Sequence, residues 1–267
     1  MSLRAFARRV VPRRVRLRLR RRPVWMGGLR RVTPVSPDFG VSRGTPVDRY
    51  YIEVFVERHG SRIRGRVLEI GEQLYVRERG AFAAREAGDP LPPVRAGVDQ
   101  VDILDLAESN PQVTIVADLN DPDAAVPADA FDCVICTQTL QFVYDVSTAL
   151  RTLQRAVKPG GVLLITLPGI SQVASPELIK SPGLTGADYP GGPAALLDYW
   201  RFTPALADRL CAEGLGPDGW EIESFGNVLT AVAFLHGLTA EELRRDELEH
   251  NDPVYPLLIA VASTKDV

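Results

Sequence analysis

The stretch 131–169 constrains the fold of this chain more than any other. Two nearly unbroken apolar runs, 131–136 and 161–167, have the composition of strands that are buried on both faces of a sheet. Between them, Asp145 precedes a segment with apolar residues at helical spacing, and a Pro-Gly-Gly run at 159–161 follows it. The stretch therefore predicts a strand, a helix and a second, parallel strand joined by a right-handed crossover.

Parallel strands joined in this way belong to a doubly wound sheet, in which ligands bind beyond the carboxyl ends of the strands. We therefore expect a site next to residues 137–141 and 168–172. Shorter apolar patterns predict the remaining strands. The chain is expected to be an α/β protein with a doubly wound, mostly parallel seven-stranded sheet, its other strands lying at 66–71, 101–106, 113–116, 220–225 and 255–262.

Helix signals flank these strands. Thr45 is expected to cap a helix that has Pro46 at its first position and ends at Gly60. Thr203 is expected to cap another, and 228–238 is apolar enough to be a buried helix. Residues 77–93 are rich in charged residues, Gly and Pro, so we expect a poor helix there. Residues 170–193 follow the strand at 161–167 and are expected to form a substrate lid.

Three side chains near the first helix, Arg43, Arg49 and Tyr50, could reach over the site edge or could simply belong to the protein surface and its packing. The segment 198–202, Asp-Tyr-Trp-Arg-Phe, allows two interpretations in the same way. It shapes an acceptor pocket, or it fastens a loop to the next helix.

The charge is distributed unevenly. Residues 1–31 hold 12 arginines and no acid, although the net charge of the 267 residues is -3. The remainder then has 31 - 12 = 19 basic against 34 acidic residues, a net charge of -15. We predict a flexible basic arm at 1–31 and one further domain at 32–267.

Four interpretations of the arm remain open. It contacts an anionic membrane, binds nucleic acid, acts as a transit peptide or stays solvated. Nucleic acid is not expected, because aromatic residues for base stacking are sparse there. No apolar run approaches the roughly 20 residues of a membrane-spanning helix. The expected location is cytoplasmic, with contact at the inner face of the membrane as the remaining alternative.

The three cysteines and three histidines do not predict a metal site. Cys133 and Cys136 have CxxC spacing, but on a strand an offset of three directs the two thiols to opposite faces. The histidines are scattered along the chain. We expect neither a metal nor a disulfide.

Five segments together resemble the successive motifs of the class I S-adenosylmethionine-dependent methyltransferases of the type 11-like group. They are VLEIG at 67–71, Asp105, Asp118, FDCVIC at 131–136 and KPGGVLLITLP at 158–168. The resemblance covers 66–168 and implies a Rossmann-like methyltransferase fold with S-adenosylmethionine as its cofactor. Flanking segments also resemble a bacterial subgroup found near glycosyltransferases.

The resemblance implies a set of cofactor-binding residues. Asp105 is expected to accept hydrogen bonds from the ribose hydroxyls, and Asp118 with the amide of Leu119 to recognise adenine. The full expected set is Glu69, Gly71, Asp105, Asp118, Leu119, Thr137 and Gln138. The chain departs from the family where a glycine-rich loop is usual, because Glu72 and Gln73 follow Gly71 and the next glycine is Gly80.

The resemblance implies transfer of a methyl group to a hydroxyl or amine of a small molecule or glycan. The sequence assigns no catalytic base, because Gln141 stands where many relatives have a histidine and cannot take a proton. Tyr51, His59, Glu72 and Arg201 are candidates for testing.

Two alternatives remain beside the methyltransferase. The first is a non-catalytic, methyltransferase-like module that binds a partner and has a degenerate cofactor loop. The second is an NAD-dependent oxidoreductase. It fits less well, because that fold has GxGxxG and an acid about 20 residues further on.

Overall fold

The computed structural model describes residues 27–108, 111–174, 197–216 and 219–266. The chain forms two compact units, Met1–Thr33 and Pro34–Val267. In the first, the described residues hold a single 3-10 turn, η1 (Gly27–Leu29). Most of the predicted basic arm and residues 175–193 of the predicted lid lie outside the described residues, so both stay predictions.

The second unit is built on one seven-stranded sheet with the order β3-β2-β1-β4-β5-β7-β6. All neighbouring strands are parallel except that β7 runs antiparallel to both β5 and β6. This confirms the predicted doubly wound, mostly parallel sheet. The strands are β1 (Gly65–Ile70), β2 (Val98–Asp105), β3 (Ile115–Val116), β4 (Phe131–Thr137), β5 (Val157–Pro168), β6 (Trp220–Phe225) and β7 (Leu258–Thr264).

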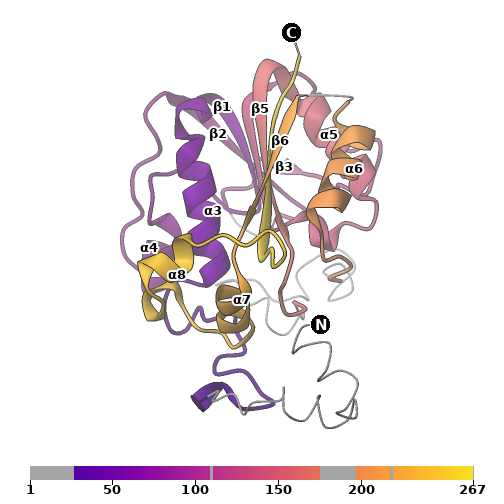
Figure 1. Ribbon diagram of the computed structural model, residues 1–267. Coiled ribbons are helices and arrows are strands. Elements are labelled where there is room, and N and C mark those ends of the chain that lie inside the picture. Colours follow the sequence, from indigo (N-terminus) through magenta and orange to yellow (C-terminus); the bar gives the residue numbers. More distant parts are fainter. Residues whose placement is uncertain (1–26, 109–110, 175–196, 217–218, 267) are drawn as a thin grey trace, which may run out of the picture. The chain divides into compact units, whose positions relative to one another are not determined.

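Helices cover both faces of this sheet (Figure 1). Helix α3 lies on one face, next to α7, and α5 and α6 pack together on the other. The helices are α3 (Val47–Arg58), α4 (Ala81–Ala87), α5 (Val146–Ala156), α6 (Pro204–Gly214), α7 (Val228–Leu235) and α8 (Arg245–Glu249). Short 3-10 turns are η2 (Gly60–Arg62), η3 (Leu140–Phe142) and η5 (Ala240–Glu242).

Strand β4 divides its side chains between the two faces, as the pleat requires. Cys133 and Ile135 belong to the core beneath α3, whereas Val134 and Cys136 belong to the core beneath α5 and α6. Both cysteines are buried free thiols. The prediction that the CxxC pair points to opposite faces is confirmed.

The strand–helix–strand unit at 131–169 forms as predicted. The Asp145 side chain caps α5 by accepting a hydrogen bond from the Thr148 N–H at 2.9 Å. Strand β5 begins at Val157, directly after the helix. The Pro-Gly-Gly run therefore lies inside the strand, where the pairing with β4 is irregular between Phe131 and Cys133.

Two local predictions are wrong. Helix α3 begins at Val47, with Pro46 at the cap position and no side-chain cap from Thr45. The cause is tertiary: the Thr45 carbonyl accepts from the Ala240 N–H at 2.8 Å and Pro46 pairs with Thr239. The expected poor helix at 77–93 contains α4, whose Ala-rich sequence is bounded by two left-handed glycines, at φ 93° and 72°.

Candidate functional site

The register of the strands brings predicted site residues to one edge of the sheet. Ile70 of β1 pairs with Leu104 of β2, and the Gly71 N–H donates to the Leu104 carbonyl at 2.8 Å. Gly71 and Asp105 therefore follow neighbouring strand positions. On the other side of β1, Thr137 ends β4. The carboxyl ends of three adjacent strands thus meet at this edge.

A cavity of about 220 Å³ opens at this edge, beyond β1 and β4. Its walls come from the ends of these strands, the loop after β1, the first turn of α3 and helix α4. It brings four of the predicted cofactor residues together: Glu69, Gly71, Thr137 and Gln138. The remaining lining residues are Arg49, Ile70, Glu72, Leu74, Tyr75, Phe82, Arg85 and Thr139.

Glu69 lines the cavity and is almost completely buried. It is 1% exposed, and its carboxylate accepts three backbone N–H bonds, from Leu74 at 3.1 Å, Tyr75 at 2.7 Å and Val76 at 3.1 Å. Burial raises the pKa of this carboxyl to about 7, against the opposite effect of the three N–H donors. The Glu69 side chain therefore holds the atypical loop in place by binding the backbone N–H groups of that loop.

The backbone at this edge takes two left-handed conformations. Gly71 has φ 90°, and a Cβ added there would meet no atom within 4 Å, so the glycine is needed for its conformation and not for close packing. Gln138 also has a positive φ, 49°, although it is not a glycine. Its N–H donates to the Thr166 carbonyl and its own carbonyl accepts from the Gln141 side chain. Strained backbone of this kind concentrates at functional sites.

The residues predicted for ribose and adenine lie beside the cavity and do not line it. Asp105 ends β2, and one of its carboxylate oxygens accepts from the Leu106 N–H at 2.7 Å. Asp118 accepts from the Asn120 N–H at 2.8 Å, and the Leu119 side chain is buried in the core. Asp105 and Asp118 follow β2 and β3, which are the next strands along this edge of the sheet.

Of the four candidates for testing, only Glu72 lines the cavity. The Tyr51 hydroxyl is buried, donates to the Leu248 carbonyl at 2.9 Å, and has a pKa that burial raises to about 12. His59 follows the last residue of α3, whereas the cavity touches the first turn of that helix. The geometry therefore removes Tyr51 and His59 from the reacting centre.

Arg201 is held in place by its neighbours. Its guanidinium binds both carboxylate oxygens of Asp198, at 2.5 and 2.7 Å, and donates to the carbonyls of Ser171 and Gln172. This arrangement fastens the segment after β5 to the segment before α6. Of the two interpretations of 198–202, the structure supports the fastening of a loop.

Two arginines line the cavity with Glu72. Arg49, one of the side chains expected to reach the edge, comes from α3, and Arg85 comes from α4. Sequence reasoning missed Arg85 because it treated 77–93 as irregular, although the Ala-rich segment between Gly80 and Gly88 was a usable helix signal. The other two side chains expected at the edge, Arg43 and Tyr50, do not line the cavity. Arg43 pairs with Glu242, and Tyr50 packs on Tyr51.

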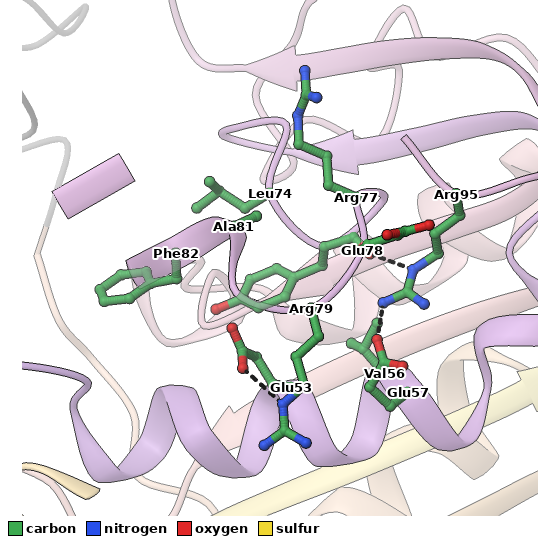
Figure 2. A pocket seen from close by; sticks show the side chains of 11 residues that line it. Glu53, Val56, Glu57, Leu74, Arg77, Glu78, Arg79, Ala81, Phe82 and Arg95 are labelled. Atoms are coloured by element: carbon green, nitrogen blue, oxygen red, sulfur yellow. Dashed lines mark hydrogen bonds and ion pairs between the residues drawn. The ribbon is translucent and has the colours of Figure 1, made fainter. Parts of the chain in front are cut away.

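A second, much smaller cavity of about 10 Å³ lies between α3 and the loop after β1 (Figure 2). It has room for about one water molecule. Glu53 of α3 binds Arg79 at 3.3 Å, and Glu57 pairs with Arg95 (Figure 2). Leu74, Tyr75 and Phe82 line both cavities and form the wall between them.

Within the described residues, no group of three or more His, Cys, Asp or Glu side chains could hold a metal ion. In the same part of the chain, no helix has the length and apolar character needed to cross a membrane.

Residues 96–165 match the family model described as a methyltransferase domain. The match spans β2 to most of β5 and begins after the atypical loop. Together with the seven-stranded, mostly parallel sheet, this match agrees with the methyltransferase resemblance of the sequence motifs.

Similar solved structures include an S-adenosylmethionine-dependent methyltransferase from Mesorhizobium loti (18% identity, TM-score 0.43, 85% of this chain and 100% of that chain). Another is phosphoethanolamine N-methyltransferase 2 from Haemonchus contortus with S-adenosyl-L-methionine (16%, 0.44, 82% and 53%). A third is a methyltransferase from Archaeoglobus fulgidus (15%, 0.44, 81% and 94%). No curated protein sequence matches the chain.

Proposed function

We propose that this chain transfers the methyl group of S-adenosylmethionine to a hydroxyl or amine of a small molecule or glycan. The observation that carries the proposal is the cavity of about 220 Å³ beyond β1 and β4. Ligands of doubly wound sheets bind at this edge. The cavity is lined by the residues that follow both strands, and Asp105 ends the next strand along the edge.

The residues at this edge fit the cofactor. Gly71 leaves open space where another residue would carry a Cβ. Polar side chains line the cavity, and Asp105 and Asp118 supply carboxylates after β2 and β3, the next strands along this edge. A carboxylate can accept hydrogen bonds from both hydroxyls of a ribose.

Bound S-adenosylmethionine would supply an electrophilic methyl group on a sulfonium. The protein's part is to position the two reactants and to exclude water, and positioning alone can supply much of the rate. Glu69 does this indirectly, because its three hydrogen bonds fix the loop that forms one wall. Thr137 and Gln138 form the opposite side at the end of β4.

The lining supplies no evident general base. None of the 12 lining residues is a histidine or lysine, and Glu72 is already paired with Arg85 at 2.5 Å. The Glu69 carboxyl is 1% exposed, and its oxygens already accept three backbone N–H bonds. Gln141 is 6% exposed and carries an amide, which takes no proton. The proposal therefore favours acceptors that need little help in losing a proton, such as a neutral amine or an acidic hydroxyl.

A second candidate function is a non-catalytic module that binds a partner. One observation favours it: the pair between Glu72 and Arg85 occupies the wall where family members usually have a glycine-rich loop. Binding of the cofactor separates the two candidates.

The test is calorimetric titration of S-adenosylmethionine and S-adenosylhomocysteine into the wild type and into Asp105→Ala. We expect binding by the wild type and a loss of about 10- to 150-fold in the variant, the effect of removing a charge-assisted hydrogen bond. Absence of binding by a folded wild type would exclude the methyltransferase and favour the partner-binding module. Circular dichroism of both proteins controls for folding.

A further inference from the structure

Helix α7 exposes an apolar face to solvent. Its sequence, VLTAVAFL, is apolar but for one threonine, a composition typical of a helix that is buried on all sides. In the structure Ala231 and Phe234 are buried on one side. The opposite side carries exposed or partly exposed apolar residues, which are Val228, Leu229, Val232 and Leu235. These four positions form one stripe, because they recur at helical spacing.

The loop before β7 adds to this stripe. Val254 is 74% exposed and Tyr255 is 41% exposed. The loop is joined to the residues that precede α7, because the Asp252 N–H donates to the Gly226 carbonyl at 2.8 Å. We call the two parts together the α7 surface. Its members are Val228, Leu229, Val232, Leu235, Val254 and Tyr255. Exposed apolar residues gathered in this way mark an interaction site.

The α7 surface lies at the same edge of the sheet as the large cavity. Leu258 begins β7 and pairs with two strand ends, Pro168 of β5 and Phe225 of β6. Helix α7 follows β6, and the loop with Val254 precedes β7, so both are at the carboxyl end of β5 (Figure 1). The large cavity opens at the carboxyl ends of β1 and β4.

The arginine-rich sequence leads into the chain at this surface. Residues 1–31 hold 12 arginines and no acid, and the second unit begins at Pro34. The N–H groups of Val35 and Ser36 donate to the carbonyl of His236, the residue after α7, at 2.8 and 3.0 Å. The chain therefore enters the second unit beside the α7 surface. Polybasic segments of this kind are attracted to anionic lipids.

The two features complement each other. Residues 32–267 have an excess of acids, which an anionic surface repels. The acids of α8, the helix packed against α7, are partly balanced: Glu247 pairs with Arg244 and Glu249 with Arg245. A small apolar surface gives only marginal membrane binding, and stable binding takes a second contribution such as a polybasic segment. The apolar residues and the arginines together meet that requirement.

We propose that the α7 surface docks on an anionic lipid bilayer. Its apolar side chains enter the boundary between headgroups and acyl chains, where the amphipathic ring of Tyr255 is also suited to lie. The arginines of residues 1–31 bind the lipid phosphates. Docking goes beyond the proposed function and does not depend on it, because it requires neither cofactor nor acceptor. It turns the edge that holds the large cavity toward the bilayer.

The experiment sediments the full chain with vesicles of phosphatidylcholine, alone or mixed with phosphatidylglycerol in equal parts. The variants Val228→Asp and Val254→Asp place a charge in the α7 surface. The first is at the start of α7, where an aspartate complements the helix dipole and the fold is expected to persist. Val116→Asp is the matched control. Val116 is also an exposed valine, in β3, at the opposite border of the sheet from β6.

We expect the wild type to bind the mixed vesicles and to bind phosphatidylcholine weakly. Val228→Asp and Val254→Asp each lower the affinity for mixed vesicles about 10-fold or more, because an apolar side chain no longer enters the bilayer. Val116→Asp, with the same net charge, binds as the wild type. Replacing Arg16, Arg18 and Arg20 together by glutamine lowers the affinity by at least as much, and so does added salt.

Two outcomes would overturn the proposal. Failure of the folded wild type to bind mixed vesicles excludes the bilayer as the partner. Equal binding by Val228→Asp, Val254→Asp and Val116→Asp shows that charge alone acts, which removes the α7 surface. Analytical ultracentrifugation of the same proteins identifies a second copy of the chain as the occupant if Val228→Asp dissociates a dimer and leaves vesicle binding unchanged. Circular dichroism and thermal melting confirm that each variant is folded.

Discussion

The two cavities on either side of Leu74, Tyr75 and Phe82 share a wall and differ in almost everything else. The small one has a volume of about 10 Å³ and is bordered by ion pairs that join α3 to Arg79 in the loop after β1 and to Arg95 before β2. The large one has about 220 Å³ and is lined by Arg49 and by the paired side chains of Glu72 and Arg85. Similar charged residues therefore close one cavity and line the other.

The difference follows from where the partners sit. Glu53 and Glu57 extend from α3 toward arginines on the far side of the small cavity, so each pair spans it (Figure 2). In the large cavity, Arg49 pairs with the preceding residue, Asp48, and Glu72 of the loop after β1 pairs with Arg85 of α4, yet about 220 Å³ stays open. The comparison teaches that the charged residues alone do not distinguish a structural contact from a cavity that can hold a ligand, whereas the volume left between the side chains does.

The largest effect is expected from removing the shared wall. Phe82→Ala should lower the free energy of unfolding by about 3 to 5 kcal/mol, the usual cost of emptying a buried aromatic site. It should also weaken the binding of S-adenosylhomocysteine, because Arg49 and Arg85, which line the large cavity, lose the ring against which they lie. Urea denaturation and calorimetry measure the two effects. Phe82→Leu, which fills most of the volume, should cost less than about 1.5 kcal/mol, and equal effects of the two variants would contradict the role of the ring.

A smaller effect is expected from pH at Glu69, behind the large cavity. Its pKa in the folded protein, about 7, lies above the ordinary value of 4.5, so between these values the folded state binds more protons than the unfolded state. Stability from this group is then fully present below about pH 4.5 and is lost as pH rises through 7. The loss is on the order of 3 kcal/mol at most.

Glu69→Gln tests this directly. The difference in unfolding free energy, wild type minus variant, should be larger at pH 5 than at pH 8, measured by denaturant titration at constant ionic strength. The amide removes the titration and keeps one oxygen that can accept the N–H bonds. A difference that does not change with pH would show that Glu69 does not titrate in this window.

The smallest effect is expected at the small cavity. Glu57→Gln removes the negative partner of Arg95, and an ion pair of this exposure typically contributes less than about 1 kcal/mol. S-Adenosylmethionine and S-adenosylhomocysteine should bind as they bind to the wild type. A loss of affinity similar to that in Phe82→Ala would show that the two cavities act as one site, and would remove the distinction on which the comparison depends.

Much of the architecture could be predicted because it depends on local patterns. The apolar run of β4, the cap at Asp145 and the strand at 220–225 are properties of neighbouring residues, and each forms where the sequence indicates. The Thr45 cap failed because Thr45 and Pro46 pair instead with residues near 240, far away in the sequence. No local pattern contains that partner.

The sequence alone determined the sheet class, the order of its motifs and the edge at which a ligand is expected, since period, capping and the chirality of the crossover are local or general rules. Tertiary structure decided which side chains meet there. Arg49, Glu72 and Arg85 come from a helix, a loop and a second helix, and Phe82 orients two of them. Their arrangement depends on the packing of α3 and α4 around the loop after β1, and such packing is set by contacts between distant segments.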